Sequence, residues 1–160
     1  MPQLELVRAD HAQAVLAFER ENRDYFAAVI PDRGDAYFAE FDARHAQLLA
    51  AQAAGTDYSH LLLTETGRIA GRFNLIGVHD GSADLGYRMA KEFAGRGLAT
   101  AAVAELRELA VTRYGLTALR AKVTLDNPAS SRILERNGFV TTGELTLNGK
   151  PAATYLCELG

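Results

Sequence analysis

One segment in the middle of the chain constrains the fold more than any other. It covers residues 86–100 and reads GYRMAKEFAGRGLAT. An apolar strand end, a short turn with two glycines and the start of an alanine-rich helix follow one another there. This layout points backbone N–H groups into one concave spot at a helix N-terminus, where unpaired donors and the helix dipole favour anions. The segment therefore predicts a phosphate-binding loop.

Length and composition indicate a single domain over residues 1–160, because 160 residues of which 48% are hydrophobic can bury a substantial core. The formal net charge is −3 and no basic block stands out, which argues against a nucleic-acid partner. Cys157 is the only cysteine, so no intrachain disulfide can form, as is typical of a reducing compartment. The first ten residues lack the apolar run of a signal peptide, and no stretch reaches the roughly 18 apolar residues of a membrane span. We therefore expect a cytoplasmic protein without membrane contact.

Apolar periodicity, turns and caps predict an α/β fold class of the α+β type, in the order βααβββαβαββ. About seven mostly antiparallel strands form one mixed sheet flanked by helices, with a single β-α-β crossover. The strands are expected over residues 4–8, 58–64, 69–78, 83–89, 117–125, 139–147 and 152–159. The helices are expected from residue 10 into the charged stretch 19–24, and over 36–54, 97–114 and 127–137. Asn148-Gly149 predicts the hairpin between the last two strands.

The glycine turn by itself leaves several ligands open. A dinucleotide fingerprint needs a third glycine where Thr100 stands, and its acidic residue about twenty positions on, whereas Asp126 lies about thirty on. That fold also needs several crossovers rather than one. The GxxxxGK[ST] pattern of a P-loop is absent from the sequence. A turn whose glycines serve only close packing remains compatible with this segment alone.

A second segment, residues 126–139 with the sequence DNPASSRILERNGF, narrows these choices. It resembles the N-x-A-S-x-R-V-L-E-K-x-G-F signature of the GNAT superfamily of N-acetyltransferases. Residues 86–100 resemble the same family's G-Y-W-L-x-P-x-x-W-G-x-G-Y-A-T signature, at the expected separation. The likeness is closest to the RimJ/RimL-like branch, which acetylates protein N-termini. It covers residue 69 onward by motif and the whole chain by the order of its elements.

The resemblance implies acetyl-CoA as co-substrate and no metal. It places the pyrophosphate on main-chain N–H groups of the glycine turn, whose lack of a Cβ allows close approach. It pairs the preceding strand end with the pantetheine arm, in a slot where that strand separates from the next one. The implied acetyl-CoA-binding residues are Tyr87, Arg88, Met89, Ala94, Gly95, Arg96, Gly97, Leu98, Ala99, Thr100 and Asn127.

Three positions depart from the family pattern. Ala94 stands where tryptophan is usual, Lys91 where proline is usual, and Glu92 where glutamine or arginine is frequent. Loss of the large aromatic side chain could widen the edge of the acetyl-CoA site. Because the expected contacts use backbone groups, we expect the affinity for acetyl-CoA to survive.

The resemblance also supplies catalytic candidates. It places Ser130 near the thioester sulfur, as a general acid for the leaving thiolate. Asn127 and Ser130 lie three residues apart at a helix start, so capping by Asn127 and a first-turn hydroxyl at Ser130 are alternative roles. Asp84 is the candidate general base, although it could equally be a solvated strand residue. An ordered water could carry the proton instead, and His79 reads as an exposed turn residue.

The expected function is transfer of an acetyl group from acetyl-CoA to a primary amine, by direct attack in a ternary complex. A protein or peptide N-terminus is one candidate acceptor. A small-molecule acetyltransferase acting on polyamines, amino acids or antibiotics, and a non-catalytic acyl-CoA-binding module, are the alternatives. The acceptor side is expected near a polar cluster for which a solvated helix end is the alternative: Glu19, Glu21, Asn22, Arg23 and Tyr25. The chain is expected to be a monomer or a homodimer.

Overall fold

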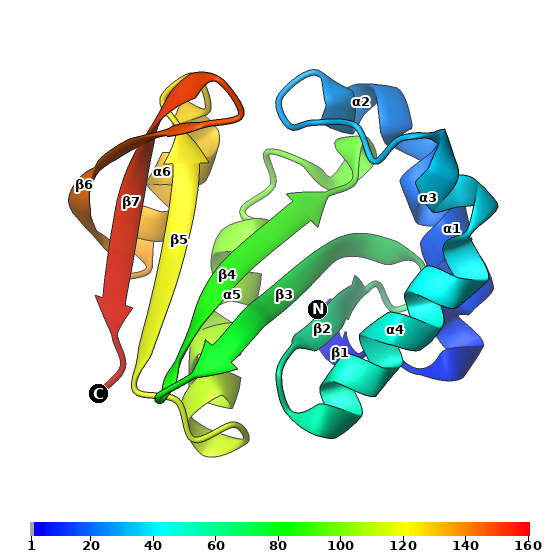
Figure 1. Cartoon of the computed structure of the whole chain (residues 1–160), viewed down its shortest axis with the longest axis horizontal. Coiled ribbons are helices and arrows are strands. Elements are labelled where there is room, and N and C mark those ends of the chain that lie inside the picture. Colours follow the sequence, from blue (N-terminus) through cyan, green and yellow to red (C-terminus); the bar gives the residue numbers. More distant parts are fainter. Residues whose placement is uncertain (1) are drawn as a thin grey trace.

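A seven-stranded mixed sheet forms the centre of the molecule, in a computed structural model that describes residues 2–160. The strand order is β1-β2-β3-β4-β5-β7-β6, as Figure 1 shows. Every neighbouring pair is antiparallel except β4 and β5, which are parallel. The expected mostly antiparallel sheet is therefore confirmed. Its strands are β1 (Gln3–Leu6), β2 (Tyr58–Leu63), β3 (Ile69–His79), β4 (Ser82–Met89), β5 (Ala118–Thr124), β6 (Val140–Leu147) and β7 (Lys150–Glu158).

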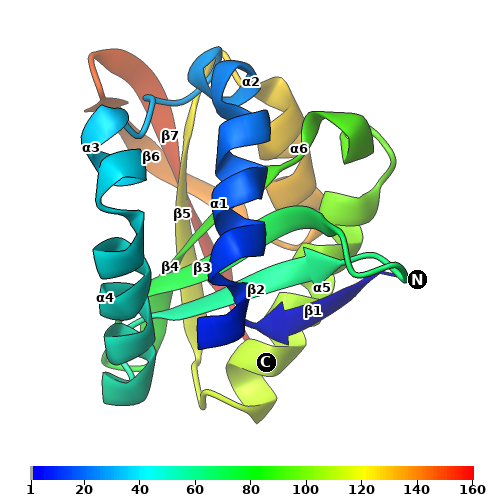
Figure 2. The ribbon, with the colours of Figure 1, turned by 90° about the vertical axis from the view of Figure 1, so that its right-hand side faces the viewer.

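Helices cover both faces of the sheet, as Figure 2 shows. One face carries α1 (Ala12–Glu21), α2 (Arg23–Ala27), α3 (Asp35–Ala39) and α4 (Phe41–Ala54). The other face carries α5 (Leu98–Thr112) and α6 (Pro128–Arg136). Two short 3-10 helices, η1 (Ala9–His11) and η2 (Lys91–Phe93), complete the chain's helical elements within residues 2–160.

The N-terminal helical region is more divided than its sequence pattern predicts. Two expected helices become four, with breaks at Asn22 and Glu40. The Asn22 side chain explains the first break, because its amide donates to the Phe18 carbonyl at 3.0 Å and its oxygen accepts from the Lys91 N–H at 2.9 Å. Such side-chain bonds to backbone compete with the helical ladder. The break turns α2 toward the end of β4.

The two faces of the sheet bury separate apolar clusters. Alternating residues of β3, such as Phe73 and Leu75, are fully buried in a cluster with Val103 and Leu106 of α5. On the opposite face, Leu61 of β2 belongs to a smaller cluster under α1 and α4. This alternation is the pattern expected of strands covered on both faces. The strand order places β4 at the centre of this doubly covered sheet.

A gap opens between β4 and β5. These strands pair only at Ser82–Ala118, Ala83–Leu119 and Asp84–Arg120. Beyond Asp84, β4 continues to Met89 while still paired with β3, and β5 continues to Thr124 while paired with β7. The two strands diverge toward the upper part of Figure 1. The expected separation of these strands is therefore present, and it leaves one edge of the β4 end without a strand partner within residues 2–160.

His60 is a fully buried side chain of β2 that bonds through both ring nitrogens. Nδ1 lies 3.2 Å from the Phe73 carbonyl oxygen, and Nε2 lies 2.6 Å from the Tyr114 hydroxyl. Because a carbonyl only accepts, Nδ1 carries the proton and Nε2 accepts from Tyr114. Burial lowers the pKa of His60 to about 4; the Phe73 carbonyl opposes this shift and the charge of Arg113 adds to it.

We expect this histidine to make stability depend on pH between about 6.5 and 4. In that window the unfolded chain binds the additional proton, so the free energy of unfolding falls as the pH falls, by about 3 kcal/mol in total. Urea unfolding at several pH values measures the slope. His60→Gln should flatten it, whereas His79→Gln, at an exposed position, should preserve it. An equal slope in wild type and His60→Gln would contradict the assignment.

Candidate functional site

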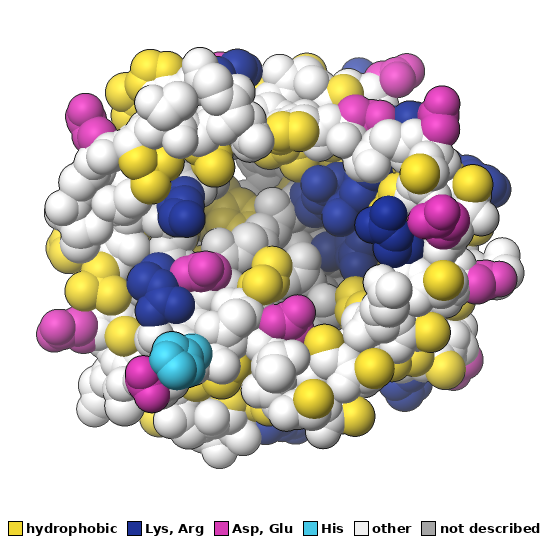
Figure 3. All heavy atoms as spheres, in the orientation of Figure 1, with side chains coloured by type: hydrophobic (Ala, Val, Ile, Leu, Met, Phe, Trp, Pro, Cys, Tyr) yellow, Lys and Arg dark blue, Asp and Glu magenta, His cyan; other side chains and the backbone are white. Residues whose placement is uncertain are grey.

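Two pockets adjoin the gap between β4 and β5. The loop pocket lies between α2, the end of β4, the glycine turn and α6, and includes Phe26, Arg88, Gly97 and Arg132. The gap pocket lies between β4, β5, α6 and the β6–β7 turn. The residues common to both are Val29, Ile30, Tyr87, Asn127 and Ser130. The two pockets are therefore parts of one hollow, which opens on the face shown in Figure 3.

The glycine turn has the backbone geometry of an anion cradle. Gly95 and Gly97 have φ values of 75° and 76°, a conformation that other residues rarely adopt. A Cβ atom on either would meet no described atom within 4 Å, so the space beside both glycines is open. Gly97 caps α5, and its carbonyl accepts the Ala101 N–H at 3.2 Å. The N–H groups of residues 98–100 precede that bond and are the ones that a helix leaves for a ligand.

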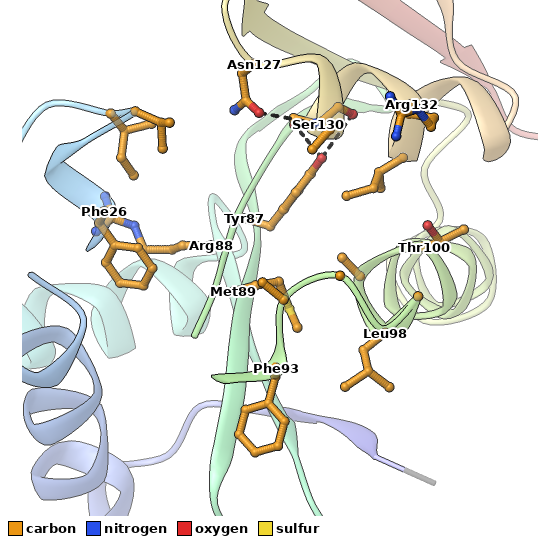
Figure 4. Close-up of a pocket in the computed structure, with 18 of the residues that line it drawn as sticks. Phe26, Tyr87, Arg88, Met89, Phe93, Leu98, Thr100, Asn127, Ser130 and Arg132 are labelled. Atoms are coloured by element: carbon orange, nitrogen blue, oxygen red, sulfur yellow. Dashed lines mark hydrogen bonds between the residues drawn. The ribbon is translucent and has the colours of Figure 1, made fainter. Parts of the chain in front are cut away.

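Most of the sequence-predicted acetyl-CoA residues line the loop pocket. These are Tyr87, Arg88, Met89, Ala94, Gly95, Gly97, Leu98, Ala99, Thr100 and Asn127, joined there by Ser130. Arg96 lies beside the pocket, with its guanidinium 5.8 Å from the centre of the Phe93 ring. Figure 4 shows how the labelled members of this group surround the opening.

Asp84 lies outside the residues that line the loop pocket and the gap pocket. It belongs to the part of β4 that still pairs with β5, below the gap. Its side chain is half exposed, and its Oδ1 accepts from Arg120 Nε at 2.9 Å. The carboxylate is thus engaged by an arginine outside the residues that line either pocket.

Tyr87, Ser130 and Asn127 form a chain of contacts across the gap. The hydroxyl oxygens of Tyr87 and Ser130 lie 2.5 Å apart, and the Ser130 N–H donates to Asn127 Oδ1 at 3.3 Å (Figure 4). Asn127 therefore caps α6, as one of its two expected roles required. Burial raises the pKa of Tyr87, and the bond to Ser130 opposes this shift only in part. The phenol consequently holds its proton at neutral pH.

The contact between the two hydroxyls could not be found by sequence reasoning. Tyr87 and Ser130 are 43 residues apart, and only the parting of β4 from β5 brings α6 over the β4 end. From the family resemblance, Tyr87 is expected to contact pantetheine through its backbone. The structure adds a side-chain contact between its hydroxyl group and Ser130.

Glu19 lies behind the wall of the hollow opposite α6 and holds Arg88, which lines the loop pocket. It is about 1% exposed, and its carboxylate accepts from Arg72 Nη1 at 2.8 Å, Arg88 Nη1 at 3.0 Å and Arg33 Nε at 3.1 Å. Burial alone would raise the pKa of Glu19, but the three arginines outweigh it and the pKa is lowered. Within the expected polar cluster, Glu19 and Asn22 are buried, whereas Glu21 and Tyr25 are exposed as a solvated helix end would be. The sequence contains a sign of the burial of Glu19, because this residue follows Val15 by four positions and so lies on the same, buried face of α1.

Residues 2–160 contain neither a metal-binding group of side chains nor a membrane-spanning helix. No three His, Cys, Asp or Glu side chains in this range are grouped so that they could hold a metal ion. None of the helices in the range has the length and apolar character required to cross a membrane.

Comparison with known proteins decides the family. The family model described as "Acetyltransferase (GNAT) domain" matches residues 3–140. The chain belongs to the GNAT acetyltransferase family. A curated relative, an uncharacterized N-acetyltransferase p20 from Bacillus licheniformis, is 31% identical over 87 residues, which are 53% of this chain. The chain spans about half the length of that relative, since the match covers 49% of it.

Solved structures agree with this assignment at the level of the fold. The ribosomal-protein-S5-alanine acetyltransferase from Vibrio fischeri has a TM-score of 0.91 at 20% identity, covering 99% of this chain and 93% of that one. RimJ from Mycobacterium smegmatis, solved with CoA-disulfide, has a TM-score of 0.86 at 22% identity, covering 97% and 80%. Spermidine N-acetyltransferase from Vibrio cholerae, solved with CoA and spermine, has a TM-score of 0.82 at 17% identity, covering 99% and 95%. The fold is thus shared by enzymes named for proteins and for polyamines.

Acetyl-CoA is the co-substrate of this family. Binding of acetyl-CoA therefore tests whether the glycine turn holds a pyrophosphate. We expect Gly97→Ala to weaken acetyl-CoA binding about tenfold, because the added methyl group enters the open space and displaces a hydrogen bond to a charged group. The same change should lower the free energy of unfolding by about 1 kcal/mol, since alanine is strained at positive φ. Calorimetric titration and urea unfolding measure the two effects.

Gly115→Ala is the matched control for this substitution. Gly115 follows α5, has a φ of 65°, and has equally open space on its Cβ side. It should show a similar loss of stability with unchanged acetyl-CoA affinity. Equal affinities in the Gly97 and Gly115 variants would remove the glycine turn from the acetyl-CoA site.

Proposed function

We propose that the chain is an acetyl-CoA-dependent N-acetyltransferase that acts on the α-amine of a protein or peptide. Acetyl-CoA and the acceptor would bind together, and the amine would attack the thioester directly. The observation that carries this proposal is the gap between β4 and β5, because it joins the glycine turn to the Tyr87–Ser130 pair within one hollow.

The donor side of the proposal uses mostly backbone groups. The N–H groups of residues 95–100 would hold the pyrophosphate, with Arg132 and Arg136 of the loop pocket adding positive charge. Residues 87–89 would present their free strand edge to the pantetheine arm, which would bind as an extra strand beside β4. Since neither interaction uses the indole ring that Ala94 lacks, the departure at that position is compatible with binding.

The proposed chemistry follows from the position of two hydroxyl groups. As the amine nitrogen bonds to the thioester carbonyl carbon, the bond from that carbon to sulfur breaks and the thiolate leaves. Ser130 would give its proton to the sulfur, and the Tyr87 hydroxyl, 2.5 Å away, would replace it. Tyr87 would then regain a proton from solvent, which keeps the phenol neutral between turnovers. Holding both substrates in one hollow would supply much of the rate by proximity.

The amine must also lose a proton. The position of Asp84 beside Arg120 leads us to favour water as the carrier of that proton to solvent over the aspartate. A peptide α-amine has a pKa of about 8, so a sizeable fraction is neutral near physiological pH. A lysine-like amine, with a pKa of about 10.4, would need a stronger base.

An amine panel with detection of the released thiol tests the function. Peptides with free N-termini, spermidine, free amino acids and an aminoglycoside should be compared at saturating acetyl-CoA. The proposal expects thiol release and N-terminal acetylation with peptides. Tight acetyl-CoA binding without turnover on any amine would instead identify a non-catalytic acyl-CoA-binding module.

Ser130→Ala tests the proposed acid in the same assay. We expect kcat to fall about 100-fold, because one positioned proton donor is lost, while the Kd for acetyl-CoA stays close to that of wild type. Ser131→Ala, which changes the neighbouring hydroxyl outside both pocket linings, should retain kcat. An unchanged kcat in Ser130→Ala would exclude Ser130 from proton transfer.

A further inference from the structure

Three arginines converge on one buried carboxylate at the wall of the hollow. Arg72 and Arg88 stand directly opposite each other on β3 and β4, an arrangement in which like charges repel. Glu19 lies between them and bonds to both, and Arg33 reaches the same carboxylate from the connection between α2 and α3. We call Glu19, Arg33, Arg72 and Arg88 the arginine cluster.

The arginine cluster carries more positive than negative charge. Its three guanidinium groups face a single carboxylate. The Arg72 side chain is only 5% exposed, and its Nε is buried with no hydrogen-bond partner among residues 2–160. Buried cationic groups are costly unless they are paired. The cluster is therefore suited to receive a further anion.

The neighbouring acids reduce this excess without cancelling it. Asp32 and Asp35 both bind Arg23, at 2.8 and 2.9 Å from its Nη2, and Asp32 also accepts the Gly34 N–H. Asp35 is almost fully exposed. Arg23 balances one of these two carboxylates, so the four arginines and three carboxylates of the two groups together keep an excess of one positive charge.

The cluster lies next to the proposed reaction point. Arg88 follows Tyr87 on β4, about 3.8 Å away between Cα atoms, and its side chain points to the opposite face of the sheet. Figure 4 shows Arg88 beside Phe26, while Tyr87 points to Ser130. Arg88 and Ser130 both line the loop pocket. An acceptor whose amine reaches Ser130 would have its next one or two residues beside Arg88.

The remaining charged residues of the hollow have the same sign. Arg88 lines the loop pocket, and Lys122 and Lys150 line the gap pocket, where Lys150 also pairs with Asp126. Arg132 and Arg136 line the loop pocket as well, on the side proposed for the pyrophosphate. Figure 3 shows dark blue side chains gathered on the wall of the hollow. A positive field disfavours protonated amines and lowers the pKa of an amine that enters it. It therefore opposes a polyamine and favours an acceptor that brings its own negative charge.

We infer that the arginine cluster selects acceptors that carry a carboxylate within one or two residues of the reacting amine, as in a peptide with aspartate or glutamate near its N-terminus. This inference rests on the proposed acetyltransferase function and names its substrate class. Arg88 would bind the acceptor carboxylate directly, while Arg72 and Glu19 would hold Arg88 in position.

A peptide series on the full-length chain tests the selection. Peptides that differ only at the second residue, Ser-Asp, Ser-Gln and Ser-Lys, should be compared with spermidine and with free serine. We expect kcat/KM to fall in the order Asp, Gln, Lys, with about tenfold between Asp and Gln, the effect of one hydrogen bond to a charged group. Added salt should reduce this ratio, because it screens the attraction.

In the variants Arg88→Gln and Arg33→Gln, the ratio of kcat/KM for the Ser-Asp peptide to kcat/KM for the Ser-Gln peptide should fall toward one. Arg33 is partly exposed in a connecting segment, so its variant keeps the test available if Arg88→Gln fails to fold. Arg44→Gln, which removes an exposed arginine paired with Glu40 on α4, should keep the wild-type ratio. Circular dichroism of each variant confirms that it is folded.

The results of the peptide series distinguish failure of the carboxylate selection from failure of the proposed acetyltransferase function. Equal rates on all three peptides, or a preference for Ser-Lys or spermidine, would overturn the inference and leave the acetyltransferase function standing. A preference for free serine over every peptide would support the carboxylate site and place its ligand on the amino acid itself. A lack of acetylation of every amine in the series would refute the proposed function, and the inference would fall with it.

Discussion

The parting of β4 from β5 is the constraint on which the rest of the molecule depends. Two parallel strands that pair at only three positions and then diverge expose a backbone edge in the middle of a sheet, where such edges are normally covered. The gap brings together elements from distant parts of the sequence, with the glycine turn after β4 on one side and the start of α6 after β5 on the other. A ligand that supplies a strand-like edge would complete the sheet, and the pantetheine arm of acetyl-CoA has that chemistry.

Glu19 secures the wall opposite α6. By bonding to Arg72 and Arg88 on two strands and to Arg33 before α3, one carboxylate ties the N-terminal helices to the end of β4. Removal of this carboxylate would leave three guanidinium groups facing each other in a poorly solvated place. The arrangement both supports the hollow and gives it a positive wall, so structural support and charge selection arise from the same contacts.

Much of this organisation could be predicted from the sequence, because it depends on local signals. The turn at Asn148-Gly149, the glycines before α5 and the Asn127 cap each follow from the conformations that those residue types allow. The division of the N-terminal helices could not be predicted, since it depends on Asn22 bonding to Lys91, 69 residues away. The Tyr87–Ser130 contact and the arginine cluster were missed for the same reason: each joins side chains whose proximity exists only in the folded sheet.

A crystal structure of the chain with acetyl-CoA tests the central claim most directly. We expect the pyrophosphate within hydrogen-bond distance of the N–H groups of residues 95–100, and the pantetheine arm in the gap beside residues 87–89 of β4. We also expect the thioester sulfur next to Ser130 and Tyr87. Acetyl-CoA bound elsewhere, with the gap between β4 and β5 left open to solvent, would contradict this claim.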